Sequence, residues 1–258
     1  MKKIYFFDVD NTIRSNKDQK IFPQTLKLLK ELSMNPDYIL GFATGRGPSK
    51  IYVVNDIKDY FKYKILVNGA VILEDDKLFY ELPIETKDVD AVVKDTLKKG
   101  FSMGMVGYDL EAVTFFDEHV AYALKGYTTT KPIFDPEFHL KHHVYQLWIF
   151  HSDTNKLMNL AKQYTQFTPY LWHYGGVDLV YPHVSKDAAI KEIMKKYPDY
   201  QLITVGDGHN DIEMIKLGDI GIAMGNSGWE DVKAAATLVA PSIEEDKMYD
   251  FFKENGLL

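Results

Sequence analysis

Short apolar runs alternate along the chain with stretches that have helical spacing. Residues 3–7 form an apolar run typical of a buried strand, and residues 24–33 repeat leucine every third position. Strand and helix patterns then follow at 38–44, 50–61 and 64–73, and a turn with a short strand at 74–82. Because strands alternate with helices, the pattern predicts βαβ units and a parallel sheet.

The pattern changes at about residue 83. A helical stretch at 85–100 precedes short aromatic segments with strand spacing, which predicts an α+β unit with antiparallel strands. From residue 178 the alternation of strands and helices returns and continues to the end. The sequence therefore predicts an α/β protein with a doubly wound, Rossmann-like parallel sheet: residues 1–82 and 177–258 form the core, and 83–176 form a smaller inserted α+β domain.

The amino-acid composition argues against several classes of binding partner and of metal site. The chain has 46% hydrophobic and 26% charged residues, as in ordinary globular proteins, and a net charge of −7. The negative charge argues against nucleic-acid and anionic-membrane binding. The chain has no cysteine, which excludes disulfides and thiolate metal sites. With no signal-like or membrane-spanning apolar run, we expect a cytoplasmic protein.

Two acids end the first apolar run. Asp8 and Asp10 are separated only by Val9, and carboxylates this close repel each other unless a cation or a shared proton offsets the repulsion. Ligands of open α/β sheets bind outside the carboxyl ends of the strands. This fragment alone leaves two interpretations open, a metal or acid–base site and a polar turn after a buried strand.

Other predicted strands also end in polar residues, and a parallel sheet brings those ends to one edge. Carboxylates without cysteine favour a hard cation such as Mg²⁺. A threonine at the start of a helix can hold phosphate, a lysine can neutralise it, and an aspartate can attack it. Helix capping or a solvated lysine is the alternative for each position. The residues that converge with Asp8 and Asp10 are Thr44, Gly45, Arg46, Lys186, Asp207 and Asp211.

Four of these segments together resemble the motifs of the haloacid dehalogenase-like superfamily of phosphatases. "DVDNT" resembles its Asp-x-Asp-x-Thr motif, "GFATGR" the strand ending in Thr or Ser, "VSKDAAI" the lysine motif, and "GDGHND" the Gly-Asp-x-x-x-Asp motif. The predicted insert lies where the type IIB caps of the Cof-like subfamily lie, and "VNGAVI" and "IAMGNS" are also similar to that subfamily. Asn11 and Ser227 depart from the commoner Gly and Ala.

The resemblance implies a mechanism. Asp8 attacks phosphorus, and Asp10 protonates the leaving alcohol and then activates water against the aspartyl-phosphate. Mg²⁺ bridges Asp8, the backbone carbonyl of Asp10, Asp207 and the phosphate. Asp211 orients Lys186 or a metal-bound water, and Arg46 is a candidate contact for the substrate. The phosphate-binding residues implied by the resemblance are Thr44, Gly45, Lys186 and Asn210.

The predicted function is a Mg²⁺-dependent phosphatase that hydrolyses a small phosphomonoester, with sugar phosphates, nucleotides or pyridoxal phosphate as the substrate class that the resemblance implies. A phosphotransferase or mutase that passes the phosphoryl group to a sugar hydroxyl is an alternative, as is a non-enzymatic phosphate-sensing module. A histidine-rich segment invites a metal interpretation, but no carboxylate is spaced to help, which favours surface or packing roles. The histidines concerned are His139, His142, His143 and His151.

Overall fold

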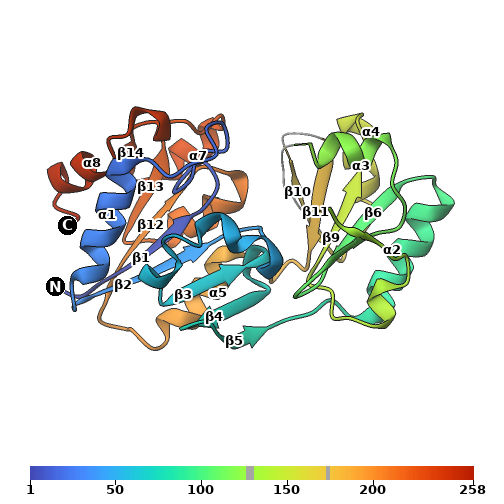
Figure 1. Cartoon of the computed structure of the whole chain (residues 1–258), viewed down its shortest axis with the longest axis horizontal. Coiled ribbons are helices and arrows are strands. Elements are labelled where there is room, and N and C mark those ends of the chain that lie inside the picture. The colour runs from blue at the N-terminus through green and yellow to red at the C-terminus, as the bar shows by residue number, and fades with distance from the viewer. Residues whose placement is uncertain (126–130, 173–174) are drawn as a thin grey trace. The chain divides into compact units, whose positions relative to one another are not determined.

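The computed structural model describes residues 1–125, 131–172 and 175–258 and shows an α/β protein with two sheets (Figure 1). Its chain divides into two compact units. The first unit contains Met1–Gly45, Tyr52–Tyr80 and Ser185–Leu258, and the second contains Arg46–Ile51 and Glu81–Val184. The predicted fold class, a doubly wound sheet interrupted in sequence by an α+β insert, is confirmed.

The first unit is built on an eight-stranded sheet. Its middle strand β1 pairs in parallel with β12 on one side and with β2 on the other, so three polar strand ends are neighbours. The order across the sheet is β14 (Leu238–Ala240), β13 (Ile220–Met224), β12 (Gln201–Gly206), β1 (Lys3–Asp8), β2 (Tyr38–Ala43), β3 (Tyr63–Leu66), β4 (Val71–Glu74) and β5 (Lys77–Glu81).

Helices cover both faces of this sheet because β1 is apolar on both sides. Ile4 and Phe6 pack toward α5 (Lys186–Met194) and α6 (Ile212–Leu217). Tyr5 and Phe7 contact Phe252 on the opposite face. Among the described residues, no helix combines the length and apolar character needed to cross a membrane. The remaining helices of this unit are α1 (Pro23–Met34), α7 (Glu230–Ala234) and α8 (Met248–Glu254), with 3₁₀ turns at His209–Asp211 and Ile243–Glu245.

Two local predictions for residues 50–73 are wrong. Residues 50–61, expected as a helix, form the 3₁₀ segments Pro48–Val54 and Lys58–Tyr60, because the β-branched pair and the Asn-Asp step that follows it disfavour a continuous α-helix. Residues 64–73, expected as one strand, form antiparallel β3 and β4 joined by the 3₁₀ turn Val67–Gly69. Positive φ angles of 52° at Val67 and 55° at Asn68 reverse the chain there.

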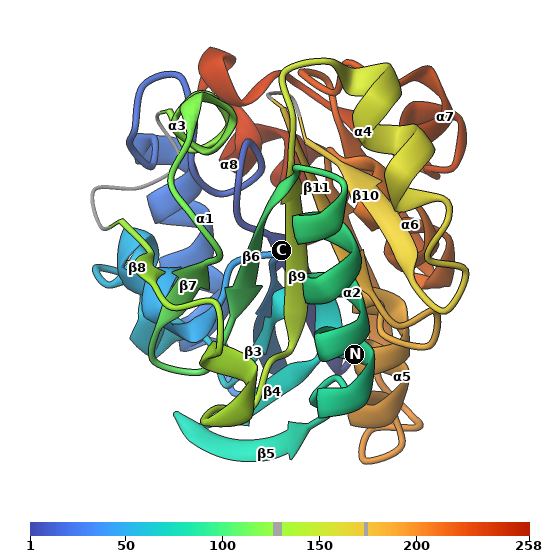
Figure 2. The same ribbon diagram turned by 90° about the vertical axis from the view of Figure 1, so that its right-hand side faces the viewer.

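The second unit has a six-stranded sheet covered on one face by α2 (Thr86–Lys98) and α4 (Thr154–Ala161), which lie in front of it in Figure 2. Alternate residues of β6 and β9 point into this apolar layer. α3 (Glu118–Ala123) and a 3₁₀ turn at Phe138–Leu140 complete the unit. The order across the sheet is β10 (Thr168–Leu171), β11 (Gly176–Val180), β9 (Gln146–Phe150), β6 (Ser102–Val106), β7 (Glu111–Val113) and β8 (Ile133–Phe134).

The boundaries of the compact units differ from those expected. β11, which the sequence placed at the start of the second core segment, pairs with β9 and β10 in the second unit. Arg46–Ile51 also packs in the second unit, although it lies within 1–82. A short apolar strand has the same pattern in either sheet, so periodicity does not reveal which sheet it joins.

Candidate active site

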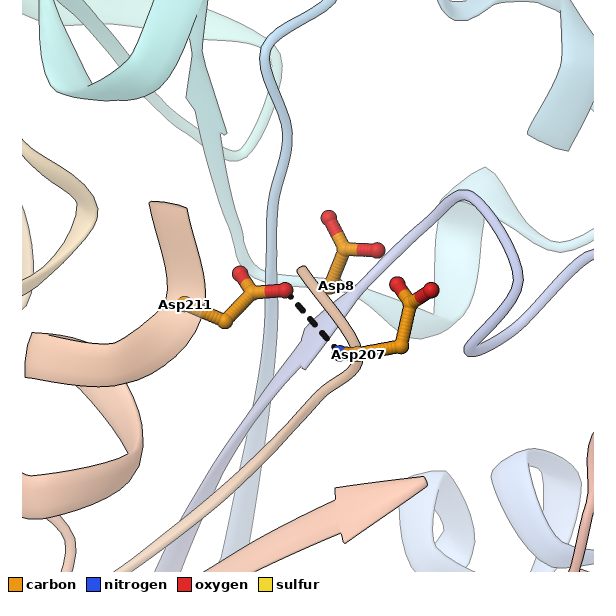
Figure 3. A group of neighbouring side chains, drawn as sticks. All are labelled: Asp8, Asp207 and Asp211. Atoms are coloured by element: carbon orange, nitrogen blue, oxygen red, sulfur yellow. Dashed lines mark hydrogen bonds between the residues drawn. The ribbon is translucent and has the colours of Figure 1, made fainter. Parts of the chain in front are cut away.

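The ends of three neighbouring strands define the site. Asp8 is the last residue of β1 and pairs in register with Ala43 of β2, so Thr44 follows beside it. β12 ends at Gly206 on the other side of β1, and Asp207 follows. Figure 3 shows the carboxylates of Asp8, Asp207 and Asp211 grouped at this edge. The parallel pairing thus brings together acids that are about two hundred positions apart in the sequence, as predicted.

Lys186 lies at the centre of the charges. It is the first residue of α5, whose N-cap Ser185 accepts a hydrogen bond from the backbone of Ala188. The Lys186 ammonium donates to Asp8 Oδ1 at 2.5 Å and to Asp211 Oδ1 at 2.6 Å. Because Lys186 is only 1% exposed and Asp211 is fully buried, these ion pairs lie away from bulk water. Each charge therefore depends on the others.

Asp211 holds the loop that carries Asp207. Its Oδ2 accepts hydrogen bonds from the backbone N–H groups of Asp207 at 3.0 Å and Gly208 at 2.9 Å. Its other oxygen binds Lys186, so both oxygens are engaged. Gly206 must be glycine, because a Cβ there would lie 2.5 Å from Asp211 Cγ. Asp211 therefore contacts both Lys186 and the loop that follows β12.

Carboxylate oxygens from Asp8, Asp207 and Asp211 all lie within 4.8 Å of one another, which suits a divalent cation. Asp211 already uses both oxygens, whereas Asp8, among residues 1–125, 131–172 and 175–258, accepts a hydrogen bond only through Oδ1. Within the described part of the chain, the Asp207 carboxylate accepts no hydrogen bond, so Asp8 Oδ2 and Asp207 fit a metal best. An all-oxygen donor set favours a hard ion such as Mg²⁺.

Burial and mutual repulsion raise the pKa values of Asp8 and Asp207. Burial, opposed by Lys186 and reinforced by Asp211 and Asp10, raises the pKa of Asp8 to about 7. Burial and then the charges of Asp8 and Asp211 raise the pKa of Asp207 well above its usual range. The pKa of Lys186 is raised: burial opposes this, but the charges of Asp211 and Asp8 outweigh it. Asp10 lies outside the three-carboxylate cluster, yet its charge acts on both Asp8 and Asp207.

These shifts predict that stabilisation by Mg²⁺ depends on pH. When folding raises the pKa of an acid, the folded protein loses stability as the pH rises from the acid's usual pKa through the raised one. The reason is that the buried carboxyl must then become charged. Without metal, the fold should therefore lose stability as the pH passes from about 4 to about 7. Bound Mg²⁺ offsets this repulsion but competes with protons below about pH 7.

The measurement is thermal unfolding with Mg²⁺ and with a chelator. We expect a larger Mg²⁺-induced rise in Tm at about pH 8 than at about pH 5. Asp207→Asn should remove most of the rise at the higher pH. An equal rise at both pH values would contradict the proton competition.

Asn68 links the candidate phosphate-binding residues. Its backbone N–H donates to the Thr44 carbonyl at 3.0 Å, and its side-chain oxygen accepts from Asn210 Nδ2 at 2.9 Å. A Cβ at Gly45 would lie 3.3 Å from the Asn68 amide, so the two residues pack closely. Sequence reasoning did not assign a role to Asn68. The available signal was Asn-Gly after an apolar strand, which favours positive φ.

Two further polar residues, to which the sequence assigned no role, contact the loops that carry the acids. Ser227 Oγ donates to the Asp207 carbonyl at 2.6 Å, and Asn226 Nδ2 donates to the Asn11 carbonyl at 2.9 Å. Asn11 has a φ of 58°, in the left-handed region that asparagine tolerates. The loop after β13 therefore fixes both acid-bearing loops. The departures at Asn11 and Ser227 are accommodated by specific contacts.

The remaining predicted positions lie elsewhere. Arg46 packs within the second unit, where its charge acts on Glu111. Within the described residues, the only group of three or more acids and histidines close enough to share a metal is Asp8, Asp207 and Asp211. His119 and His151 instead stack at 4.3 Å between ring centroids, and His142 stacks on Phe138 at 4.4 Å.

Comparison with known proteins gives consistent matches. A family model described as haloacid dehalogenase-like hydrolase matches residues 5–252. The protein named "Putative phosphatase YkrA" from Bacillus subtilis (strain 168) is 27% identical, over 99% of this chain and 98% of its own. The subclass IIB sugar phosphatase BT4131 has a structure with a TM-score of 0.87 and 26% identity, with complete coverage of both chains. BT1666 from Bacteroides thetaiotaomicron, at 22% identity and a TM-score of 0.88 over 100% of this chain and 96% of that one, shows the shared fold.

Proposed function

The chain belongs to the haloacid dehalogenase-like hydrolases, and from that premise we propose that it is a phosphatase that hydrolyses a small phosphomonoester through an aspartyl-phosphate at Asp8. The observation that carries the proposal is the buried contact of Asp8 with Lys186, beside Asp207. Relatives named as phosphatases over nearly the whole chain support it. Sugar phosphates come first as substrate class because BT4131 is described as a sugar phosphatase; nucleotides and pyridoxal phosphate remain candidates.

Asp8 would form the covalent intermediate. Lys186 binds its Oδ1, which orients the carboxylate. A bond forms between one carboxylate oxygen of Asp8 and phosphorus while the bond from phosphorus to the leaving oxygen breaks, and Asp10 gives its proton to the leaving oxygen. Asp10 then takes a proton from water, whose oxygen attacks phosphorus and releases inorganic phosphate and free Asp8.

The surrounding residues would bind and orient the phosphate. Thr44 and Gly45, held by Asn68, and the Asn210 amide supply donors, and Lys186 supplies positive charge. Asp8 and Asp207, with the Asp10 backbone carbonyl, are the proposed Mg²⁺ ligands. When bound, Mg²⁺ would offset the charge of the acids and of the phosphate oxygens.

The test is release of inorganic phosphate from a panel of sugar phosphates, nucleotides and pyridoxal phosphate, with Mg²⁺ and with a chelator. We expect at least one phosphomonoester to be hydrolysed only when Mg²⁺ is present. Product analysis with acceptor sugars distinguishes hydrolysis from phosphotransfer. A protein that binds phosphate and Mg²⁺ but releases nothing from any substrate would support the sensing module instead.

A further inference from the structure

The second unit contains a buried ion pair between Lys50 and Glu111. Lys50 lies in the segment that follows the candidate phosphate-binding residues Thr44 and Gly45 in the sequence. Lys50 Nζ lies 3.1 Å from Glu111 Oε2. Lys50 is 3% exposed and Glu111 is 4% exposed, so neither charge is solvated as a surface pair would be. Burial raises the pKa of Glu111, and the charges of Lys50 and then Arg46 oppose that rise. Removing one member of such a pair leaves a buried charge without its partner.

The two residues join segments that are distant in sequence. Glu111 begins β7 and pairs in register with Val106 of β6, next to which β7 lies in Figure 2. Lys50 lies in the 3₁₀ segment Pro48–Val54, and its backbone N–H donates to the Gly47 carbonyl at 2.9 Å. The ion pair therefore links the start of β7 to the segment Arg46–Ile51.

Close packing supports the same attachment. A Cβ at Gly47 would lie 2.8 Å from Val106 Cγ1 and 3.9 Å from Glu111 Oε1. The backbone of Gly47 thus lies directly against the end of β6. Because backbone packing and the ion pair act on the same short segment, they fix both its position and its direction.

This segment continues directly from the phosphate-binding turn. Thr44 and Gly45 end the first unit's segment, and Arg46, the next residue, begins the part that packs in the second unit. Any shift of Arg46–Ile51 is therefore transmitted through one peptide bond to Gly45. The proposed phosphate donors at Thr44 and Gly45 depend on a neighbour that the second unit holds in place.

We propose that Glu111, acting through Lys50, is a positioning residue for phosphate binding, so that the inserted unit helps to set the geometry of the phosphate-binding turn. The inference rests on the proposed function only in taking Thr44 and Gly45 as phosphate ligands. Glu111 itself touches no reacting atom in this role. Its loss should weaken phosphate binding much more than it slows the chemical step.

The experiment measures the affinity of inorganic phosphate by calorimetry in wild type, Glu111→Gln, Lys50→Met and the double variant. We expect each single variant to bind phosphate about tenfold more weakly, and the double variant to be no worse than either, because all remove the same contact. Lys50→Arg keeps the positive charge and should retain most of the wild-type affinity for phosphate. In turnover assays the loss should appear in KM, with kcat nearly unchanged.

Lys94→Met is the matched control, because Lys94 pairs with Asp90 on the exposed face of α2. It should leave phosphate affinity unchanged. Thermal unfolding of every variant shows which variants remain folded. A lower affinity in a variant that is unfolded is then not counted as evidence for the positioning role. Wild-type affinity in folded Glu111→Gln, or additive losses in the double variant, would overturn the positioning role. A wild type that binds phosphate but hydrolyses nothing would overturn the proposed function alone.

Discussion

Asp8→Asn should reduce turnover by on the order of 10⁴-fold or more while the protein remains folded. Asparagine has nearly the same shape but supplies no carboxylate to attack phosphorus. The substitution removes a buried charge that burial already disfavours, and Lys186 keeps its contact with Asp211 at 2.6 Å. The measurement is phosphate release from the best substrate of the panel at saturating Mg²⁺, with the unfolding midpoint of each protein measured in parallel.

Asp207→Asn is the matched control for Asp8→Asn. Both positions lie in the same carboxylate cluster, but only Asp8 is proposed to form a covalent bond. Raising the Mg²⁺ concentration should restore part of the activity of Asp207→Asn and none of that of Asp8→Asn. Equal rates for wild type and Asp8→Asn would show that Asp8 is not the nucleophile and would refute the proposed mechanism.

Much of the site was predictable because strand ends in a parallel sheet share one edge. Asp8 ends a clear apolar strand, Thr44 and Asp207 each follow one, and β1 lies between β2 and β12. Lys186 was predictable once α5 was expected to begin beside that edge. These inferences need only periodicity and the topology of a doubly wound sheet.

Other parts depend on contacts that no local pattern records. Asn68 is positioned by a chain reversal within a segment that reads as one strand. The engagement of both Asp211 oxygens follows from the exact path of the loop after β12. Glu111 lies among residues with strand spacing, and nothing in its neighbourhood indicates that Lys50 is near. Whether two charged residues that are distant in the sequence form a buried pair depends on the tertiary structure, so a local sequence pattern does not predict it.

Lys186→Met should destabilise the fold by about 3–5 kcal/mol and lower kcat by about 10²-fold or more. Methionine has similar length but no charge, so Asp8 and Asp211 would face each other without the cation that binds both. Lys186 is the group that most strongly lowers the pKa of Asp8, so its loss should raise that pKa above about 7. Urea unfolding in a chelator, with and without the substitution, measures the loss of stability.

The pH dependence of the loss of stability in Lys186→Met distinguishes an electrostatic cause from a packing defect. In Lys186→Met the Asp8 carboxyl, whose pKa is already raised to about 7 when Lys186 is present, is protonated at about pH 5 and ionises as the pH rises. The destabilisation should therefore grow from about pH 5 to about pH 8, whereas a packing defect would be constant. Lys191→Met, on the exposed face of the same helix and paired with Asp187, should cost less than about 1 kcal/mol at any pH. Similar losses for the two variants would mean that the buried lysine does not hold the acids together.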